Sequence, residues 1–355
     1  MPGPRIAITM GDPAGIGPEI ILAAVAQLRT RVEAGELELL VIGCGTTYRR
    51  ISAELELDDG GIAAVGEDHA GAWPPIGFIE AGPVADAIVT GQVSADAGRL
   101  AYNAIDIAVR LAMDGRAQAI CTAPLNKEAL NLAGHHFSGH TELLAELTGA
   151  RDSVMMLAHG NMRVSHVSTH TALANVPGRV TPDRIRRVVE LTDEALRRLG
   201  VATPRIAVAA LNPHAGEGGL FGREDLDVTT PTLNALRAEG YDMHGPVPGD
   251  TVFVKLRAGQ YDAVVAMYHD QGHIPVKLLG FHVNPETGAW DSLSGVNVTL
   301  GLPIVRTSVD HGTAFDIAGR GIASASSLIE AIDFAMKLSA ARIADDSQET
   351  SHEHP

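Results

Sequence analysis

Short apolar runs rich in β-branched residues alternate with amphipathic helical segments along almost the whole chain. Most of these runs are apolar on both faces, and they read as strands over residues 5–9, 37–43, 117–123, 153–158, 163–169, 205–211, 261–268 and 302–309. Strands of this kind are typical of parallel sheets that helices cover on each side. The alternation therefore predicts an α/β fold, and a length of 355 residues favours about two domains.

The clearest single element is a helix that is predicted to follow Thr181. The Thr181 side chain can cap this helix, Pro182 suits its first position, and Gly200 can end it. Its buried stripe is expected to consist of Ile185, Val188, Val189, Leu191 and Leu196.

Composition excludes several classes of protein. The formal net charge of -16 argues against sequence-independent binding of nucleic acid, because such binding depends on Lys and Arg neutralising phosphates. Two cysteines, Cys44 and Cys121, cannot build a disulfide framework and are expected to be buried free thiols, which fits the cytoplasm. We expect neither a signal peptide nor a membrane span, and we predict a disordered tail over the polar residues 343–355.

The segment ITMGDPAGIGPEI, residues 8–20, predicts a strand, a tight loop and a helix that starts near Pro18. A helix N-terminus in this setting suits an anion or a cofactor. The segment is not a dinucleotide fingerprint, because Ile20 stands where the third glycine would be, and the chain has no P-loop. The pattern alone leaves a purely structural turn as an equal alternative.

Three histidines each follow an apolar run and stand beside turn-forming residues: His170, His214 and His269. The carboxyl ends of parallel strands form the ligand crevice of such sheets, so these imidazoles could converge on one divalent metal. Their wide spacing favours an open catalytic site over a structural zinc site. The alternative is that each one is a separate hydrogen-bonding histidine in a loop.

A second group of residues is suited to binding an anion. Lys277, Asn297 and Arg306 lie near predicted strand ends in an acidic chain and could clamp a phosphate or a carboxylate. His140 and Thr141 begin a predicted helix, where a small anion can also bind. Surface ion pairs remain the alternative for the two cations.

Six windows in this order resemble the 4-hydroxythreonine-4-phosphate dehydrogenase (PdxA) family: ITMGDPAGIGPE, FSGHTE, LNPHAGEGG, YHDQGHIPVK, GVNVTLGLP and RTSVDHGTAFDIAGRG. The resemblance spans about residues 4–342. It implies a two-domain isocitrate/isopropylmalate dehydrogenase-like α/β fold with parallel-rich sheets and an interdomain active-site cleft. The expected domains are 1–125 with 300–342 on the cofactor side and 126–299 for metal, substrate and dimerisation. It also implies a homodimer whose active site is shared between subunits.

The resemblance assigns roles to individual residues. His170, His214 and His269 fall on the family's metal-ligand positions, where zinc, magnesium, manganese or cobalt is expected. The implied substrate-binding residues are His140, Thr141, Lys277, Asn297 and Arg306. The glycine turn and the segment DHGTAFDIAGRGIA are similar to the cofactor end of the wider superfamily, which implies contacts to NAD or NADP from Asp12, Gly15, Gly17, His311, Gly312, Thr313 and Asp316. Asp250 and Asp270 are candidates for orienting the ligands or for accepting the proton, and plain supporting contacts are equally compatible.

The segment 278–295 is longer than the family pattern and predicts an extra turn or hairpin at Pro285, Gly288 and Trp290. An insertion beside the anion-binding residues favours the branch that oxidises and decarboxylates 4-phospho-D-threonate or 4-phospho-D-erythronate, which gives dihydroxyacetone phosphate. The alternatives are the 4-phosphohydroxy-L-threonine dehydrogenase of pyridoxal phosphate synthesis and a cis-dihydrodiol dicarboxylate dehydrogenase. A non-redox metal-dependent hydrolase or aldolase, or a sugar-phosphate binding protein, also stays open on the residues alone.

Overall fold

A computed structural model describes residues 3–83, 88–137, 139–286 and 290–349. The chain forms two compact units. Unit 1 comprises Met1–Ser153, Ser292–Val296 and Leu302–Pro355, and unit 2 comprises Val154–Asp291 and Asn297–Gly301. Each unit pairs strands with helices, so the predicted α/β class is confirmed.

The strands of unit 1 lie in the order β3-β4-β2-β1-β5-β14. The pairs β3–β4, β4–β2, β2–β1, β1–β5 and β5–β14 are all parallel. Their bounds are β1 Arg5–Thr9, β2 Glu38–Gly43, β3 Ala63–Ala64, β4 Ile76–Glu80, β5 Ala119–Thr122 and β14 Arg306–Val309. Because the strands are parallel, the loops after β1, β5 and β14 emerge at the same edge of the sheet.

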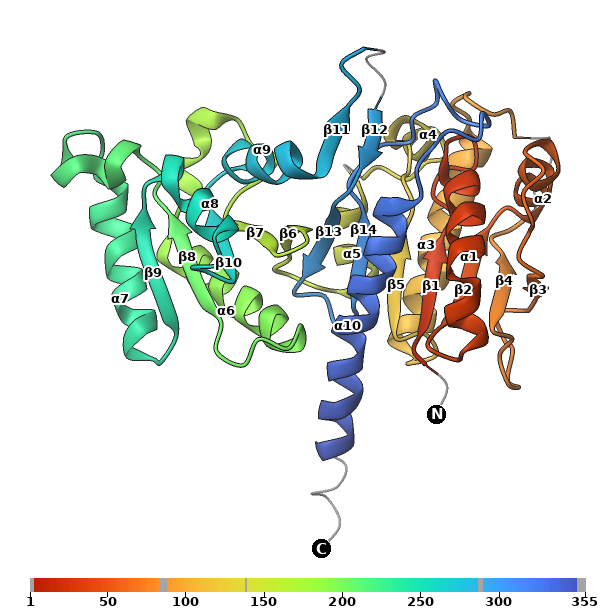
Figure 1. The fold of residues 1–355 in the computed structure, drawn as a ribbon, viewed down its shortest axis with the longest axis horizontal. Coiled ribbons are helices and arrows are strands. Elements are labelled where there is room, and N and C mark those ends of the chain that lie inside the picture. The colour runs from red at the N-terminus through yellow and green to blue at the C-terminus, as the bar shows by residue number, and fades with distance from the viewer. Residues whose placement is uncertain (1–2, 84–87, 138, 287–289, 350–355) are drawn as a thin grey trace, which may run out of the picture. The chain divides into compact units, whose positions relative to one another are not determined.

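The helices of unit 1 are α1 Gly17–Glu33, α2 Gly45–Glu54, α3 Ala95–Met113, α4 Lys127–Leu132, α5 His140–Thr148 and α10 Ser326–Glu349. Figure 1 shows α1 and α10 in front of the strands and α3 behind them. The short helices α4 and α5 both pack on α3. Residues 126–153 therefore belong to unit 1, and the first boundary falls after Ser153 instead of the predicted residue 125.

The C-terminal residues 343–349 are helical. Residues 343–349, predicted as part of a disordered tail, continue α10 as far as Glu349. A polar sequence can extend a helix that is already nucleated, because propagation costs far less than nucleation. Residues 350–355 of the predicted tail lie outside the described residues.

The strands of unit 2 lie in the order β13-β6-β7-β10-β8-β9. Their bounds are β6 Val154–His159, β7 Met162–His166, β8 Arg205–Ala209, β9 Asp242–Val247, β10 Ala263–Ala266 and β13 Val296–Leu300. β7, β10, β8 and β9 pair in parallel, but β6 and β7 are antiparallel. The expectation of parallel pairing is wrong for β6 and β7, because the two residues between them, Gly160 and Asn161, suffice for a hairpin.

The main helices of unit 2 are α6 Pro182–Arg198, α7 Thr230–Ala238, α8 Gly249–Arg257 and α9 His269–Gly280. Shorter helical turns cover Leu173–Asn175, Pro177–Arg179, Pro213–Gly219 and Asp225–Thr229. The predicted start of α6 is confirmed, because Thr181 accepts a hydrogen bond from the Arg184 backbone N–H at 3.3 Å. The predicted stripe is also confirmed, since all five of its side chains are buried.

The insertion contains β11 Phe281–Val283 and β12 Trp290–Leu293, which pair as a separate two-stranded sheet. This agrees with the predicted extra turn or hairpin, although Gly288 lies outside the described residues.

Both cysteines are free and buried, as predicted. Among the described residues, we find no helix with the length and apolar character needed to cross a membrane.

Candidate active site

The glycine turn after β1 is packed tightly against neighbouring backbone. A Cβ atom at Gly17 would lie 2.1 Å from the Met10 carbonyl oxygen, and one at Gly15 would lie 2.8 Å from the Thr313 carbonyl oxygen. The backbone N–H of Ile16 donates to that same Thr313 oxygen at 3.0 Å. The two segments predicted to contact the cofactor therefore lie side by side, and the glycines allow their backbones to approach.

Asp12 lies in this turn and its side chain is fully buried. Its Oδ1 accepts a hydrogen bond from the Ala14 backbone N–H at 2.8 Å. Its Oδ2 is buried without a hydrogen-bond partner among the described residues. Burial raises the pKa of this carboxyl from 3.8 to about 6, because the ionised form loses its hydration.

This shift predicts how the stability of the protein depends on pH. The folded protein holds the Asp12 proton up to a higher pH than the unfolded chain, so the free energy of unfolding falls as pH rises from about 4 to about 6. Asp12→Asn removes the ionisation and should raise the free energy of unfolding by up to about 3 kcal/mol near pH 7.5, but by only about 1 kcal/mol near pH 4.5.

Urea unfolding of both proteins at the two pH values measures this difference. Asp114→Asn, at an exposed position that follows α3, is the matched control and should show no pH-dependent gain. An equal effect of Asp12→Asn at both pH values would contradict the buried ionisation.

Glu19, which sequence reasoning did not single out, supports the second cofactor segment. Its Oε2 accepts hydrogen bonds from the backbone N–H groups of Gly319 at 3.1 Å and Gly321 at 3.2 Å. The side chain is buried, and burial raises the pKa of the carboxyl. Glu19 thereby ties the start of α1 to the loop that follows β14. Only its place in the first turn of a glycine-flanked helix could have indicated this role.

Arg306 is a buried cation on β14 in unit 1. It is 2% exposed, and its Nη2 donates to the Thr122 hydroxyl at 2.7 Å. Burial lowers the pKa of the guanidinium to about 10, so the group stays charged at neutral pH. Because a charge is stronger in a site that excludes water, Arg306 is well suited to bind an anion.

His140, predicted to bind the same anion, begins α5 and lies close to Arg306. Burial and the positive charge of Arg306 hold the pKa of His140 well below its ordinary value, so the ring is neutral at pH 7. Its Nε2 is buried and has no hydrogen-bond partner among the described residues. Thr141 follows at the same helix start and is half-buried. The structure therefore brings Arg306, His140 and Thr141 into one unit, as an anion site requires.

The three candidate metal ligands of unit 2 follow three neighbouring parallel strands. His170 comes after β7, His269 after β10 and His214 after β8, so all three lie at the carboxyl edge of the sheet. The rings of His170 and His269 have centroids 6.0 Å apart. The His214 ring faces Phe221, with centroids 6.3 Å apart. Across the described residues of one chain, no group of three or more His, Cys, Asp or Glu side chains is arranged to hold a metal ion.

Asp270 contacts one of these histidines directly. Its Oδ1 lies 2.7 Å from Nδ1 of His269, which leaves Nε2 of that ring to face a ligand. This geometry fits the orienting role of Asp270 better than that of a proton acceptor. Asp250 is exposed in the first turn of α8. Its predicted role stays a prediction.

The remaining predicted residues are distributed over both units. Lys277 lies on α9 with Nζ 4.7 Å from the centre of the Phe281 ring, and Asn297 is half-buried on β13. The residues after β14 comprise the half-buried His311 and Thr313 and the exposed Gly312 and Asp316. Their predicted contacts with substrate or cofactor stay predictions.

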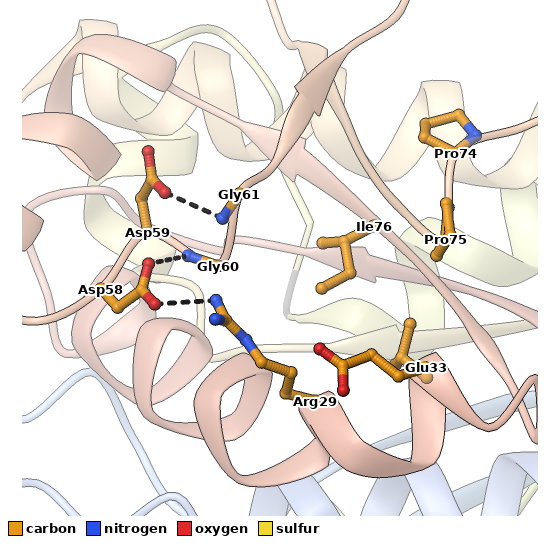
Figure 2. A pocket seen from close by; sticks show the side chains of 10 residues that line it. Arg29, Glu33, Asp58, Asp59, Gly60, Gly61, Pro74, Pro75 and Ile76 are labelled. Carbon is orange, nitrogen blue, oxygen red and sulfur yellow. Dashed lines mark hydrogen bonds and ion pairs between the residues drawn. The ribbon is translucent and has the colours of Figure 1, made fainter.

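A hollow of about 390 Å³ lies elsewhere in unit 1, beside the start of β4. Figure 2 shows Arg29 reaching Asp58, and Asp58 and Asp59 turned to the backbone N–H groups of two glycines. Its lining includes none of the predicted site residues, and its carboxylates, with Glu33, outnumber its arginine. An acidic rim of this kind repels phosphate, so we do not assign the reaction to this hollow.

The sequence profile described as pyridoxal phosphate biosynthetic protein PdxA matches residues 38–335. This chain belongs to the PdxA family. It is therefore an oxidoreductase of the PdxA type, and membership of this dehydrogenase family implies a nicotinamide cofactor and a divalent metal.

Named PdxA relatives match over nearly their whole length. A Bradyrhizobium diazoefficiens protein provisionally named D-threonate 4-phosphate dehydrogenase is 63% identical, over 97% of this chain and 99% of that protein. The D-threonate 4-phosphate dehydrogenase of Salmonella typhimurium is 48% identical, over 94% and 98%. The crystal structure of 4-hydroxythreonine-4-phosphate dehydrogenase from Klebsiella pneumoniae is 45% identical, with a TM-score of 0.80 over 95% and 100%.

Two observations indicate that residues of this PdxA chain fit the implied divalent metal and nicotinamide cofactor. The imidazoles after β7, β8 and β10 are a donor set that divalent first-row metals accept, and the ring orientation of His269 is fixed by a carboxylate. Near the cofactor segment, the orphaned Oδ2 of Asp12 is an acceptor that a cofactor hydroxyl could satisfy.

Proposed function

We propose that this PdxA-family enzyme oxidises 4-phospho-D-threonate or 4-phospho-D-erythronate with NAD or NADP and then decarboxylates the product. The observation that carries the proposal is the relative that is 63% identical and named for D-threonate 4-phosphate. The buried Arg306 with the neutral His140 supports a substrate that carries a phosphate. The second candidate substrate is 4-phosphohydroxy-L-threonine, because the solved relative that is 45% identical is named 4-hydroxythreonine-4-phosphate dehydrogenase.

The proposed chemistry assigns a task to each group of residues. Arg306, His140 and Thr141 bind the phosphate, with Lys277 and Asn297 completing the substrate contacts. A divalent metal held by the three histidines would polarise the hydroxyl and carboxylate of the substrate, and nicotinamide would accept the hydride. Asp270 holds the ring of His269 at Nδ1. Oxidation at carbon 3 yields a β-keto acid, which loses its carboxylate as carbon dioxide and leaves dihydroxyacetone phosphate.

We also propose that two copies of the chain share each site. Within one chain, His170 and His269 are the two candidate ligands whose rings approach each other among the described residues. The helix that begins at His269 also presents Ile274 and Leu278 to solvent, with exposed fractions of 61% and 79%. Exposed apolar side chains one turn apart suit a subunit contact.

The free buried cysteines fit a reducing compartment, which supports the cytoplasm as the location.

The test compares kcat/KM for three substrates, each with NAD and with NADP, in protein supplied with divalent metal. We expect 4-phospho-D-threonate or 4-phospho-D-erythronate to exceed 4-phosphohydroxy-L-threonine by about tenfold or more, because rejection of one polar group typically reaches this size. A preference of similar size for the amino acid would overturn the proposed substrate and favour the second candidate.

A further inference from the structure

Four imidazoles form a row in unit 2 that runs from the sheet to the candidate metal ligands. The ring centroids of His166 and His273 are 4.7 Å apart, those of His273 and His269 are 3.6 Å apart, and those of His269 and His170 are 6.0 Å apart. His166 and His273 are buried, with 0% and 7% of their surface exposed, whereas 40% of the His269 side chain is exposed. The two inner histidines have no role in the reaction described above.

His273 contacts His269 in two ways. The two residues are one helical turn apart on α9, so their side chains share a face. Their rings stack with an interplanar angle of 13°. In addition, Nδ1 of His273 lies 2.9 Å from the His269 carbonyl oxygen, so Nδ1 carries the proton and donates it. The side chain of His273 is thereby tied to both the ring and the backbone of His269.

The inner end of the row leaves little space for movement. A Cβ atom at Gly272 would lie 2.3 Å from Nε2 of His166, so the His166 ring sits directly against the backbone of the first turns of α9. Nδ1 of His166 lies 3.3 Å from the Met155 carbonyl oxygen on β6. The ring of His273 is thus enclosed between His166 and His269. Close packing of this kind restricts the movement of the His273 ring.

We propose that His273 is a positioning residue that fixes the ring of His269 for metal binding. The inference rests on the proposed function, because it takes His269 as a metal ligand. Asp270 holds the edge of the His269 ring at Nδ1, and His273 holds its face. With both contacts in place, Nε2 of His269 keeps one direction before any metal arrives, which removes an ordering cost from binding.

Three substitutions separate the two contacts. His273→Leu removes both the stacking ring and the donor, His273→Phe keeps a ring without the donor, and His273→Asn keeps an amide donor without the ring. The matched control is Val276→Ala, which removes buried volume from the same helix. It tests whether loosening α9 by itself affects the metal.

The experiment titrates cobalt(II) into each full-length protein and follows its visible absorption, which reports both affinity and coordination geometry. We expect His273→Leu to weaken cobalt affinity about 10- to 100-fold, with smaller losses for His273→Phe and His273→Asn. Val276→Ala should lower the melting temperature yet keep affinity within about threefold of wild type. The substitutions at His273 should also change the absorption band, which a merely structural role would leave as it is.

The outcomes distinguish the inference from the proposed function. If wild type binds one cobalt ion and His273→Leu, with a cooperative melting transition, binds it equally well, the inference is overturned while the metal site stands. If Val276→Ala weakens cobalt as much as His273→Leu, the effect is structural and the inference again fails. If wild type binds no cobalt, the metal site fails and the inference falls with it.

Discussion

Arg306→Ala is expected to lower kcat/KM for a phosphorylated substrate by about two to three orders of magnitude. The reason is that Arg306 is 2% exposed, so its charge acts in a site that largely excludes water. Losing one partner of a buried, charge-assisted contact costs about 3–4 kcal/mol, which corresponds to this range. Most of the loss should appear in KM, because the phosphate does not change during the oxidation.

Steady-state kinetics of two further variants controls this experiment. Arg306→Lys keeps the charge but loses the planar fork, and it should recover only part of the activity. Arg198→Ala removes a surface arginine that pairs with Glu194 at 2.7 Å and should change kcat/KM by less than about twofold. If Arg306→Ala keeps KM within about threefold of wild type, the phosphate is bound elsewhere.

Alanine at His170, His214 or His269 is expected to remove the bound metal and to lower kcat by about a thousandfold or more. Each substitution deletes one imidazole from an open site with few protein ligands, so the remaining ligands hold a metal too weakly to keep it during dialysis. Metal content after dialysis and initial rates measure the two effects. His244→Ala, at a half-exposed histidine that pairs with Asp242 on β9, is the control and should retain both metal and activity.

Mixing inactive variants tests whether the site is shared between subunits. A heterodimer of His214→Ala and His269→Ala contains one intact site if His214 and His269 of that site come from different chains. Activity should therefore partly return after subunit exchange. No recovery after confirmed exchange would count against a shared site. Retention of metal and near-normal rates in all three single variants would instead contradict the histidine assignment itself.

Local sequence signals predicted much of the fold. The helix from Pro182 was predictable because its cap, its first residue and its apolar stripe all favour the same helix. The antiparallel pairing of β6 and β7 was missed because apolar composition does not indicate strand direction. The helix that begins at His269 was not predicted because Gly272 and Pro275 both disfavour the interior of a helix.

The candidate site was predictable as a set of positions but not as a set of contacts. His170, His214 and His269 could be assigned to one sheet edge, because each follows a parallel strand. Contacts formed by the tertiary fold, such as those of Glu19 with Gly319 and Gly321, join residues too far apart in sequence for a local signal. The stack of His273 on His269 is nearer in sequence, but it depends on the unexpected helix α9.

The most direct test is a stoichiometric assay with 4-phospho-D-threonate and, separately, with 4-phospho-D-erythronate, each with nicotinamide cofactor and divalent metal. It measures reduced cofactor by absorbance, and dihydroxyacetone phosphate and carbon dioxide in the same sample. We predict that the three products form in equal amounts, because one hydride transfer is followed by one decarboxylation. Reduced cofactor without dihydroxyacetone phosphate, or no reduced cofactor from either four-carbon acid phosphate, would contradict this prediction.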